Sequence, residues 1–407
     1  MCRKKVPGTI LLLFICSLSF GFDFGLILDQ NADYGGYGGD GSFGYSGSLI
    51  PRLSALVGES ADIYVSAGLK ASYVENDKWR FVPELLRTEL TYYTGSFAFK
   101  AGRMYHSDPL GFIADGLFDG ARLSMDSEMG TFSLGAWYTG LLYKNRANIL
   151  MTAADREIYT REFDFADFAN SFADTYFAPR RVVSSLGWER LSLGGPLQAK
   201  AAVIAQFDLS DGEPLHSQYL AAKVSLPGNL FGFDIGGTVE LLEEDGFGGD
   251  FGMAAAAELG LHLTPPTPLP QRLSLLGRYS SGGLEGDLLA FNPVTTKAQG
   301  EIFKVGLSGI SLVSLDYIIQ PAGTFSAGLT STCFIRSDLE TYGGYPLNAQ
   351  SDGYILGSEF FGRLLWAPYS DLQVNMGGGL FLPSMGNANP DAEMSWRVEL
   401  NVIVSFL

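Results

Sequence analysis

Hydrophobic and polar residues alternate along the last fifteen positions of the chain, EMSWRVELNVIVSFL (393–407). Seven hydrophobic residues share one face: Met394, Trp396, Val398, Leu400, Val402, Val404 and Phe406. A period of two residues indicates a β-strand with one hydrophobic face. Strands of globular proteins usually have about 5 to 6 residues, whereas a strand that crosses a bilayer at a tilt needs about 9 to 11. An edge strand of a soluble β-sandwich is the alternative, but the length and the complete hydrophobic face favour a membrane-spanning strand.

The same alternation recurs along the whole chain from residue 22 and predicts about 18 strands. They are expected at 22–29, 43–57, 63–73, 80–93, 97–105, 117–126, 131–143, 182–191, 197–209, 217–226, 230–242, 251–263, 273–280, 301–319, 324–336, 353–366, 372–382 and 393–407. The glycine- and tyrosine-rich stretch 31–41 is interpreted as a loop. Segment 301–319 is the least regular, because Gly306, Ser308 and Gly309 could form a turn, so 16 strands remain an alternative. We therefore expect an all-β fold, a single transmembrane antiparallel β-barrel over residues 22–407.

The predicted connections alternate in length. Short turns are expected at 58–62, 94–96, 127–130, 192–196, 227–229, 264–270, 320–323 and 367–371, and mostly longer loops at 106–116, 144–179, 243–250, 281–300, 337–352 and 383–392. Outer-membrane barrels have short turns at the periplasmic rim and long loops outside. An even number of strands then places both termini in the periplasm, and the longest loop, 144–179, is expected to be extracellular.

The beginning of the chain predicts export. Arg3, Lys4 and Lys5 precede a hydrophobic run, 6–20, and a small residue, Gly21. This order is typical of a signal peptide, 1–21, cleaved near Gly21. Lipidation at Cys16 is an alternative that the preceding large residue disfavours. Cleavage would leave one cysteine of three, so no intramolecular disulfide is expected.

Charge and composition narrow the function classes. The chain has 27 basic and 44 acidic residues, and removal of the signal peptide lowers the formal net charge from −17 to −20. This charge disfavours a nucleic-acid partner. Only 17% of the residues are charged, 51 are glycine and 13% are aromatic, a composition typical of outer-membrane barrels.

Two segments resemble known protein families. The closing strand with the aromatic Phe406, followed by Leu407, resembles the assembly signal of bacterial outer-membrane β-barrels. This resemblance implies an outer-membrane location in a Gram-negative-type envelope, contact with outer-membrane lipid, and recognition of the Phe406-Leu407 end by the barrel assembly machinery. The sequence KAGRMYHSDPLGFIADGLFDGARL (100–123) resembles alginate-export-type and spirochaetal porin-like barrels through Arg103, Asp119, Gly120 and Arg122. Porins of similar size are often trimers, which leaves a homotrimer open.

The polar faces of the predicted strands define the interior. With 16 to 18 strands the barrel is too wide for wall side chains to fill, so water is the expected content. The candidates for pore-lining residues are Arg87, Glu89, Arg103, Arg122, Lys200, Lys223, Asp234, Glu240, Arg278, Arg363, Arg397 and Glu399. Charges of both signs would create a transverse field that selects hydrophilic solutes. The alternative is that these charges pair with one another or solvate the wall.

Aromatic residues recur at helical spacing within loop 144–179 and predict a short amphipathic helix. The candidates for a constriction are Asp164, Phe165, Asp167, Phe168, Phe172, Asp174 and Tyr176. Such a loop could fold into the bore and narrow it, or it could pack over the outer rim.

Catalytic and metal-binding patterns are weak. His106, His216 and His262 lie on separate segments, and the sequence contains no Cys/His cluster or full EF-hand pattern. We therefore expect no enzyme activity, no metal and no cofactor. The leading hypothesis is an outer-membrane, porin-like channel for passive diffusion of small hydrophilic solutes and ions, with a modest preference for cations. The alternative is a substrate-specific uptake or export barrel for a hydrophobic or polymeric cargo, and a surface adhesin or a barrel hydrolase is less favoured.

Overall fold

The computed structural model describes residues 21–75, 78–165, 168–210, 212–244, 246, 248–283, 288–339 and 353–406. Residues 1–20 and Leu407 lie outside these ranges. The signal peptide and the role of Leu407 in assembly therefore stay predictions.

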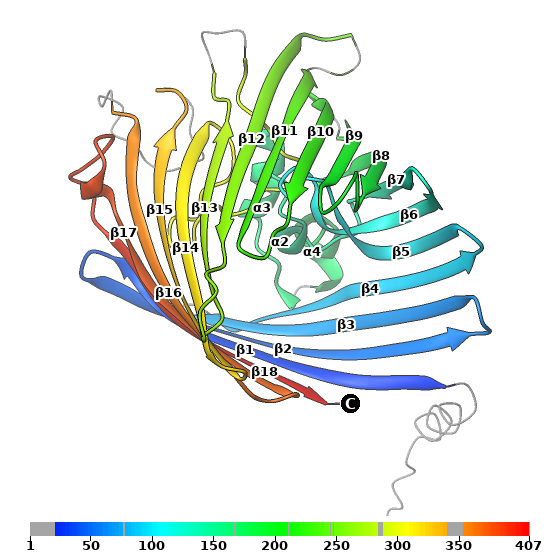
Figure 1. Cartoon of the computed structure of the whole chain (residues 1–407), viewed down its shortest axis with the longest axis horizontal. Coiled ribbons are helices and arrows are strands. Elements are labelled where there is room, and N and C mark those ends of the chain that lie inside the picture. The colour runs from blue at the N-terminus through cyan, green and yellow to red at the C-terminus, as the bar shows by residue number, and fades with distance from the viewer. Residues whose placement is uncertain are drawn as a thin grey trace, which may run out of the picture.

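The described chain forms one closed antiparallel barrel of 18 strands (Figure 1). The strands are β1 (Phe22–Tyr37), β2 (Asp40–Val57), β3 (Ala61–Val74), β4 (Arg80–Thr94), β5 (Phe97–Ser107), β6 (Asp115–Ser127), β7 (Gly130–Tyr138), β8 (Arg181–Arg190), β9 (Gln198–Asp208), β10 (His216–Leu226), β11 (Phe231–Glu243), β12 (Phe251–Leu263), β13 (Gln271–Ser280), β14 (Ile310–Ala322), β15 (Phe325–Arg336), β16 (Ile355–Tyr369), β17 (Leu372–Leu382) and β18 (Ser395–Phe406). Each strand pairs with its sequence neighbours, and β1 pairs with β18 to close the barrel. Closure satisfies the backbone groups that an open sheet edge would expose to lipid. The predicted fold class and the count of 18 are confirmed, and the alternative of 16 strands is wrong.

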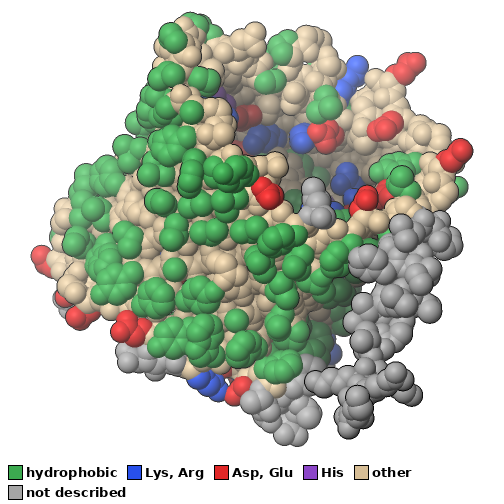
Figure 2. All heavy atoms as spheres, turned by 90° about the horizontal axis from the view of Figure 1, so that it is seen from below, with side chains coloured by type: hydrophobic (Ala, Val, Ile, Leu, Met, Phe, Trp, Pro, Cys, Tyr) green, Lys and Arg blue, Asp and Glu red, His purple; other side chains and the backbone are tan. Residues whose placement is uncertain are grey.

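The C-terminal strand β18 has the predicted two faces. Leu400 and Val398 are 41% and 51% exposed on the outer surface of the barrel. The next residue after Leu400, Asn401, points inward, where its side-chain amide donates to the Asp29 carboxylate at 2.6 Å. Hydrophobic side chains cover much of the outer surface of the molecule (Figure 2). This distribution is the one that contact with lipid requires.

The predicted loop at 31–41 is wrong. Strand β1 continues to Tyr37, strand β2 begins at Asp40, and only residues 38–39 lie between them. A β-carbon at Gly36 would lie 2.0 Å from the backbone oxygen of Asp40, so the hairpin can close here only with glycine. Gly38 has a φ of +55°, a conformation that favours glycine in a tight turn. The glycines that suggested a loop are therefore required by close strand pairing.

The predicted strand at 301–319 is shorter in the structure. Strand β14 begins only at Ile310, and residues 281–309 form one long connection. Similarly, β7 ends at Tyr138, so the longest connection covers 139–180 instead of 144–179.

The two rims differ as predicted. The rim that holds both termini has turns such as 95–96 and 128–129, whereas the opposite rim has the connections 139–180 and 281–309. We call them the termini rim and the long-loop rim. That the termini rim faces the periplasm stays a prediction. The helices in the described ranges are all too short, or too polar, to cross a membrane.

Candidate functional site

Three connections at the long-loop rim fold into the barrel. They are the connections 108–114, 139–180 and 281–309, whose described residues (108–114, 139–165, 168–180, 281–283 and 288–309) we call the plug. Connection 139–180 contains α2 (Lys144–Ala147), α3 (Ala153–Thr160) and α4 (Phe168–Thr175), which lie inside the ring of strands in Figure 1. Helix α4 lies where the aromatic spacing predicted a helix. The sequence left open whether the connection folds into the bore or packs over the rim, and in the structure it folds into the bore.

Hydrophobic side chains of the plug pack against the inner wall and form one buried cluster. It includes Leu110, Phe112, Ile113, Leu142, Ile149, Met151, Phe291, Val294 and Leu307 of the plug with Met104, Phe118, Trp137, Val183, Ile204, Tyr219 and Leu242 of the wall. Each of these side chains is at most 7% exposed. The inner wall of β5 to β12 is therefore covered by a packed core. The expectation that water fills the whole bore is wrong on this side, because the connections, and not the wall side chains, fill it.

Asp108 shapes the shortest part of the plug. Its carboxylate accepts hydrogen bonds from the backbone N–H groups of Leu110, Gly111, Ile113 and Ala114 at 2.8 to 3.0 Å. Burial raises the pKa of Asp108, and these four hydrogen bonds oppose the rise. The folded loop then reaches across to β11, where a β-carbon at Gly236 would lie 2.4 Å from Leu110. Gly236 thus leaves the space that Leu110 fills.

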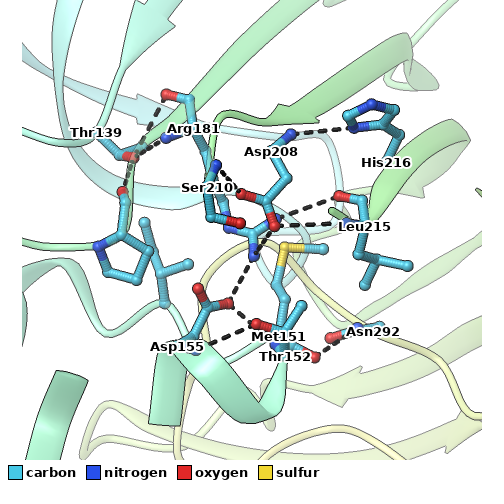
Figure 3. Close-up of polar contacts among 12 residues, drawn as sticks. Thr139, Met151, Thr152, Asp155, Arg181, Asp208, Ser210, Leu215, His216 and Asn292 are labelled. Atoms are coloured by element: carbon cyan, nitrogen blue, oxygen red, sulfur yellow. Dashed lines mark hydrogen bonds and ion pairs between the residues drawn. The ribbon is translucent and has the colours of Figure 1, made fainter. Parts of the chain in front are cut away.

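A buried ion cluster fixes connection 139–180 to the wall (Figure 3). Arg181, the first residue of β8, is fully buried. Its Nη2 donates to Asp155 of α3 at 2.6 Å and lies 3.0 Å from the Asp208 carboxylate on β9. Thr139 joins the two ends of the connection, because its hydroxyl donates to the Pro179 oxygen at 2.5 Å and accepts from the Arg181 N–H at 3.0 Å. Burial raises the pKa of Asp155, while Arg181 lowers it.

Backbone contacts fix connection 281–309. The Asn292 N–H donates to Glu240 of β11 at 2.8 Å, and the Asn292 amide donates to the Met151 oxygen at 3.0 Å. The second contact joins this connection to connection 139–180. Further along, Glu359 of β16 accepts three backbone N–H groups, those of residues 301, 302 and 303, at 2.8 to 3.0 Å. The plug is therefore held at several separate points.

On the other side of the bore, cavities lie between the plug and the wall of β1 to β3 and β18, although the plug still contacts β4 and β16. We call this space the passage. A cavity of about 770 Å³ at the long-loop rim is lined by Asp33, Asp40, Glu301, Lys304 and Arg397 among others. A second cavity of about 420 Å³ lies between α2, residues 295–298 and the wall. Figure 2 shows a hollow in the molecule with Lys and Arg side chains inside it and acidic side chains around it.

The charged residues around the passage come from both the plug and the wall. The plug carries Arg146 on α2 and Lys304 in connection 281–309. Arg146 pairs with Glu84 through two hydrogen bonds of 2.9 and 3.0 Å, which raise the pKa of Arg146, and Asp29 on β1 adds a weaker attraction. Burial and the nearby Arg397 lower the pKa of Lys304, while Asp33 and Glu399 oppose this change. At one cavity a basic group of the plug therefore pairs directly with an acid of the wall, and at the other Lys304 lies near both the acids and Arg397 of the wall.

Most of the predicted pore-lining charges pair along the wall. Their contacts are Arg87 with Glu89 at 2.7 Å, Lys200 with Glu189 at 2.8 Å, Lys223 and Arg278 with Glu258 at 2.7 and 3.2 Å, Asp234 with His262 at 2.7 Å, Arg363 with Asp316 at 2.7 Å and Arg397 with Glu399 at 3.1 Å. From the predicted set, the structure pairs only Arg87 with Glu89 and Arg397 with Glu399. Glu240 is fully buried under the plug, and Arg122 lines a separate cavity.

Arg103 occupies a gap in the wall. Strand β4 pairs with β5 only from Thr88 onward, so its earlier residues lack a partner on that side. Arg103 pairs with Asp119 at 2.7 Å and donates to the backbone oxygens of Leu85 and Leu141 at 2.5 and 2.9 Å. With 5% exposure it faces no open space. These contacts give Arg103 a structural part, in joining β4, β6 and the plug.

The predicted constriction residues fall into three groups. Phe172 and Tyr176 pack with Phe163 against Val82 of β4, and the Tyr176 hydroxyl donates to the Pro83 oxygen at 2.7 Å. Burial raises the pKa of Tyr176 to about 12. Asp164 pairs with Lys78 at 2.6 Å, whereas Phe165 and Asp174 are exposed. Asp167 and the side chain of Phe168 lie outside the described residues.

Sequence reasoning missed Asp29, Asp33, Glu84, Arg146 and Lys304. Strand alternation could have found Asp29, but Asp33 fell in the predicted loop 31–41, and a register shift in β4 between Leu85 and Arg87 puts Glu84 out of step with the polar residues that follow. Arg146 and Lys304 lie in connections, where no periodic signal indicates which way a side chain points.

Solved structures with the same fold come from Pseudomonas aeruginosa. OccK2 (OpdF) has a TM-score of 0.62 at 11% identity, with 95% of this chain and 97% of that chain covered. OpdL has a TM-score of 0.61 at 13% identity, with 95% and 98% covered. OccK2 in complex with glucuronate has a TM-score of 0.62 at 11% identity, with the same 95% and 98% coverage. No protein-family model matches the sequence, and no curated protein matches it. The chain has the fold of porin-type outer-membrane barrels, and the expected porin-like architecture is confirmed.

Proposed function

We propose that the protein is an outer-membrane channel through which small hydrophilic solutes and ions diffuse. The observation that carries this proposal is the passage between plug and wall, with cavities of about 770 and 420 Å³ lined by charges of both signs. In this proposal the termini rim faces the periplasm, and the strand end at Phe406 and Leu407 is recognised during barrel assembly.

Opposed charges explain which solutes pass. Basic groups on the plug and acidic groups on the wall create an electric field across the passage. A polar solute lowers its energy in this field by aligning its dipole with it. A hydrophobic solute gains nothing from this field and must displace water from charged groups. The hydrophobic cluster and the ion pairs hold the plug, so the field keeps its direction.

The balance of charge predicts a modest preference for cations. The formal charge of the chain is −17, and the wall of the passage contributes Asp29, Asp33 and Glu399. Arg146, Lys304 and Arg397 oppose them, so we expect a small selectivity.

Swelling of liposomes that contain the refolded protein tests the proposal. Neutral sugars of increasing size should enter at rates that fall steadily with size, because diffusion through a fixed opening depends on the solute radius. A barrel that migrates as folded on a gel, yet admits none of the sugars, would contradict the proposal.

Substrate-specific uptake is the second candidate. The extensive plug narrows the bore, and a protein of the same fold has been solved with glucuronate. Glucuronate and glucose have similar sizes, so their entry rates separate the two candidates. Simple diffusion predicts unsaturated rates for both sugars, with the anionic glucuronate somewhat slower, whereas specific uptake predicts saturation with one of them.

A further inference from the structure

A third cavity lies apart from the passage, against the inner wall of β5 to β9. It has a volume of about 180 Å³, and its lining includes His106, Arg122, Ser133, Ser185 and Lys200. Ser133 lies near turn 128–129, and Lys200 lies near turn 191–197, so the cavity is on the termini side of the plug. It ends against Ala202 and Ile204, which belong to the buried hydrophobic cluster. We call it the blind cavity.

Arg122 is the uncompensated charge of the blind cavity. Its side chain is half-buried and has no ion pair or hydrogen bond with any residue in the described ranges. The residue opposite Arg122 on β5 is Lys100, which pairs with Glu89 at 3.1 Å. The residue opposite it on β7 is Gly135, which offers no side chain. A half-buried guanidinium in this position attracts an anion.

His106 provides a buried donor in the same cavity. It is only 8% exposed, and neither of its ring nitrogens has a hydrogen-bond partner. The ring packs on Trp137, with 4.1 Å between the ring centroids, so its position is fixed. A buried imidazole N–H without an acceptor is costly, and a ligand that supplies an oxygen removes this cost.

The two acids that line the cavity already have other partners. The Asp108 carboxylate is turned into its own loop, where it accepts four backbone N–H groups. Glu189 pairs with Lys200 at 2.8 Å. The positive charge of Arg122 is therefore not balanced by an acid that lines the cavity. The hydroxyls of Ser133 and Ser185 add further hydrogen-bond donors.

We propose that the blind cavity binds a small oxyanion, with Arg122 as its charge partner and His106 as a hydrogen-bond donor. One water molecule takes about 30 Å³ in the liquid, so a cavity of this size has room for a phosphate or a small carboxylate. The site goes beyond the proposed channel, because none of its lining residues lines either cavity of the passage.

Calorimetric titration of the refolded barrel with inorganic phosphate, and separately with acetate, tests this inference. We expect one saturable site for at least one anion, with affinity weakened at least about tenfold by Arg122→Gln. His106→Phe preserves the stacking on Trp137 and removes both nitrogens, so it should weaken binding as well. The ring-nitrogen NMR signals of His106, identified by their loss in His106→Phe, should shift when the anion is added to the wild type.

Arg52→Gln is the matched control. Arg52 lies on β2 and has no ion pair or hydrogen bond with a residue that the structure describes, but it does not line the blind cavity. Folding of every variant is checked by heat-dependent migration on a gel. The inference is refuted by absence of saturable binding, by equal affinity in Arg122→Gln, or by equal losses in Arg52→Gln and Arg122→Gln. Binding without conductance would refute the channel and leave this site in place.

Discussion

At the scale of the residue, individual buried carboxylates hold the plug in place. Asp108 and Glu359 accept backbone N–H groups of the connections, and Asp155 joins α3 to Arg181. A buried carboxylate that loses its partners is costly, so these contacts favour one position of each connection. The plug is therefore held by polar contacts of defined geometry in addition to its hydrophobic cluster.

Asp155→Ala should loosen connection 139–180 without unfolding the barrel. The substitution removes one of the two acidic partners of the buried Arg181 and the Asp155 half of the capping box of α3, and such losses cost about 3 to 5 kcal/mol. Limited proteolysis should then cut within the connection, while heat-dependent migration of the barrel is unchanged. Glu157→Ala on the same helix is the control, because Glu157 forms only an exposed pair with Arg161. Equal protease resistance in Asp155→Ala and the wild type would contradict this part of the account.

Lys304→Gln should make the channel more selective for cations. One charge at about 4 Å contributes about 1 kcal/mol in water, so the permeability ratio of K⁺ to Cl⁻ should rise about two- to fivefold. The reversal potential in a salt gradient measures this ratio. Lys78→Gln is the control, since Lys78 pairs with Asp164 and lines neither cavity of the passage. An unchanged ratio in Lys304→Gln would place Lys304 outside the conducting path.

The sequence located individual charges on the strands but not their partners. Strand alternation placed Arg87, Glu89, Arg397 and Glu399 on polar faces, where the structure has them paired. The contact of Arg181 with Asp155 joins a strand to a helix 26 residues earlier in the chain. No local pattern encodes a contact between a connection and the wall, so these partners could not be predicted.

At the scale of the element, substitutions in β18 test which side chains of the strand face the lipid. Leu400→Arg or Val402→Arg should each lower the free energy of unfolding by about 2 to 4 kcal/mol, because the charge would enter the hydrocarbon layer. Asn401→Arg should cost less, since Asn401 points inward toward Asp29. Urea unfolding of the barrel in lipid measures all three. Equal losses at the three positions would contradict the two faces of β18.

The strands were predictable where one face is hydrophobic and the other polar. This pattern gave the number of strands and most of their positions. The pattern missed the end of β1 and the start of β2, because glycine contributes no side chain to the alternation. In the structure, Gly36 lies in close contact with the neighbouring strand. The pattern also failed at 301–309, where hydrophobic residues such as Phe303 and Val305 pack in a buried connection instead of a strand.

The whole molecule combines a closed barrel with a plug that covers one side of the bore. The sequence indicated that a connection could fold inward, yet it did not indicate that three connections share one hydrophobic cluster. That cluster depends on contacts between segments more than 100 residues apart, such as those of Phe112 and Phe291, whose ring centroids are 6.1 Å apart.

The orientation of the barrel can be tested on intact cells. After replacement of Cys333, the one cysteine in the described ranges, we expect a cysteine at Asp167 to react with an impermeant thiol reagent. A cysteine at Pro266, in the connection 264–270 of the termini rim, should not react. Labelling of both positions, or of Pro266 alone, would contradict a periplasmic termini rim.

Current through single refolded barrels in a planar bilayer tests the central claim most directly, that the passage conducts. In a background without Cys333, Asn145→Cys places a thiol at the cavity between α2 and the wall. A bulky thiol reagent should lower the current of this variant sharply, because the added group occupies the passage. The same reagent should leave Ser192→Cys, in the turn between β8 and β9, at its original current. A folded barrel that carries no current, or a current that the reagent does not change in Asn145→Cys, would contradict the account.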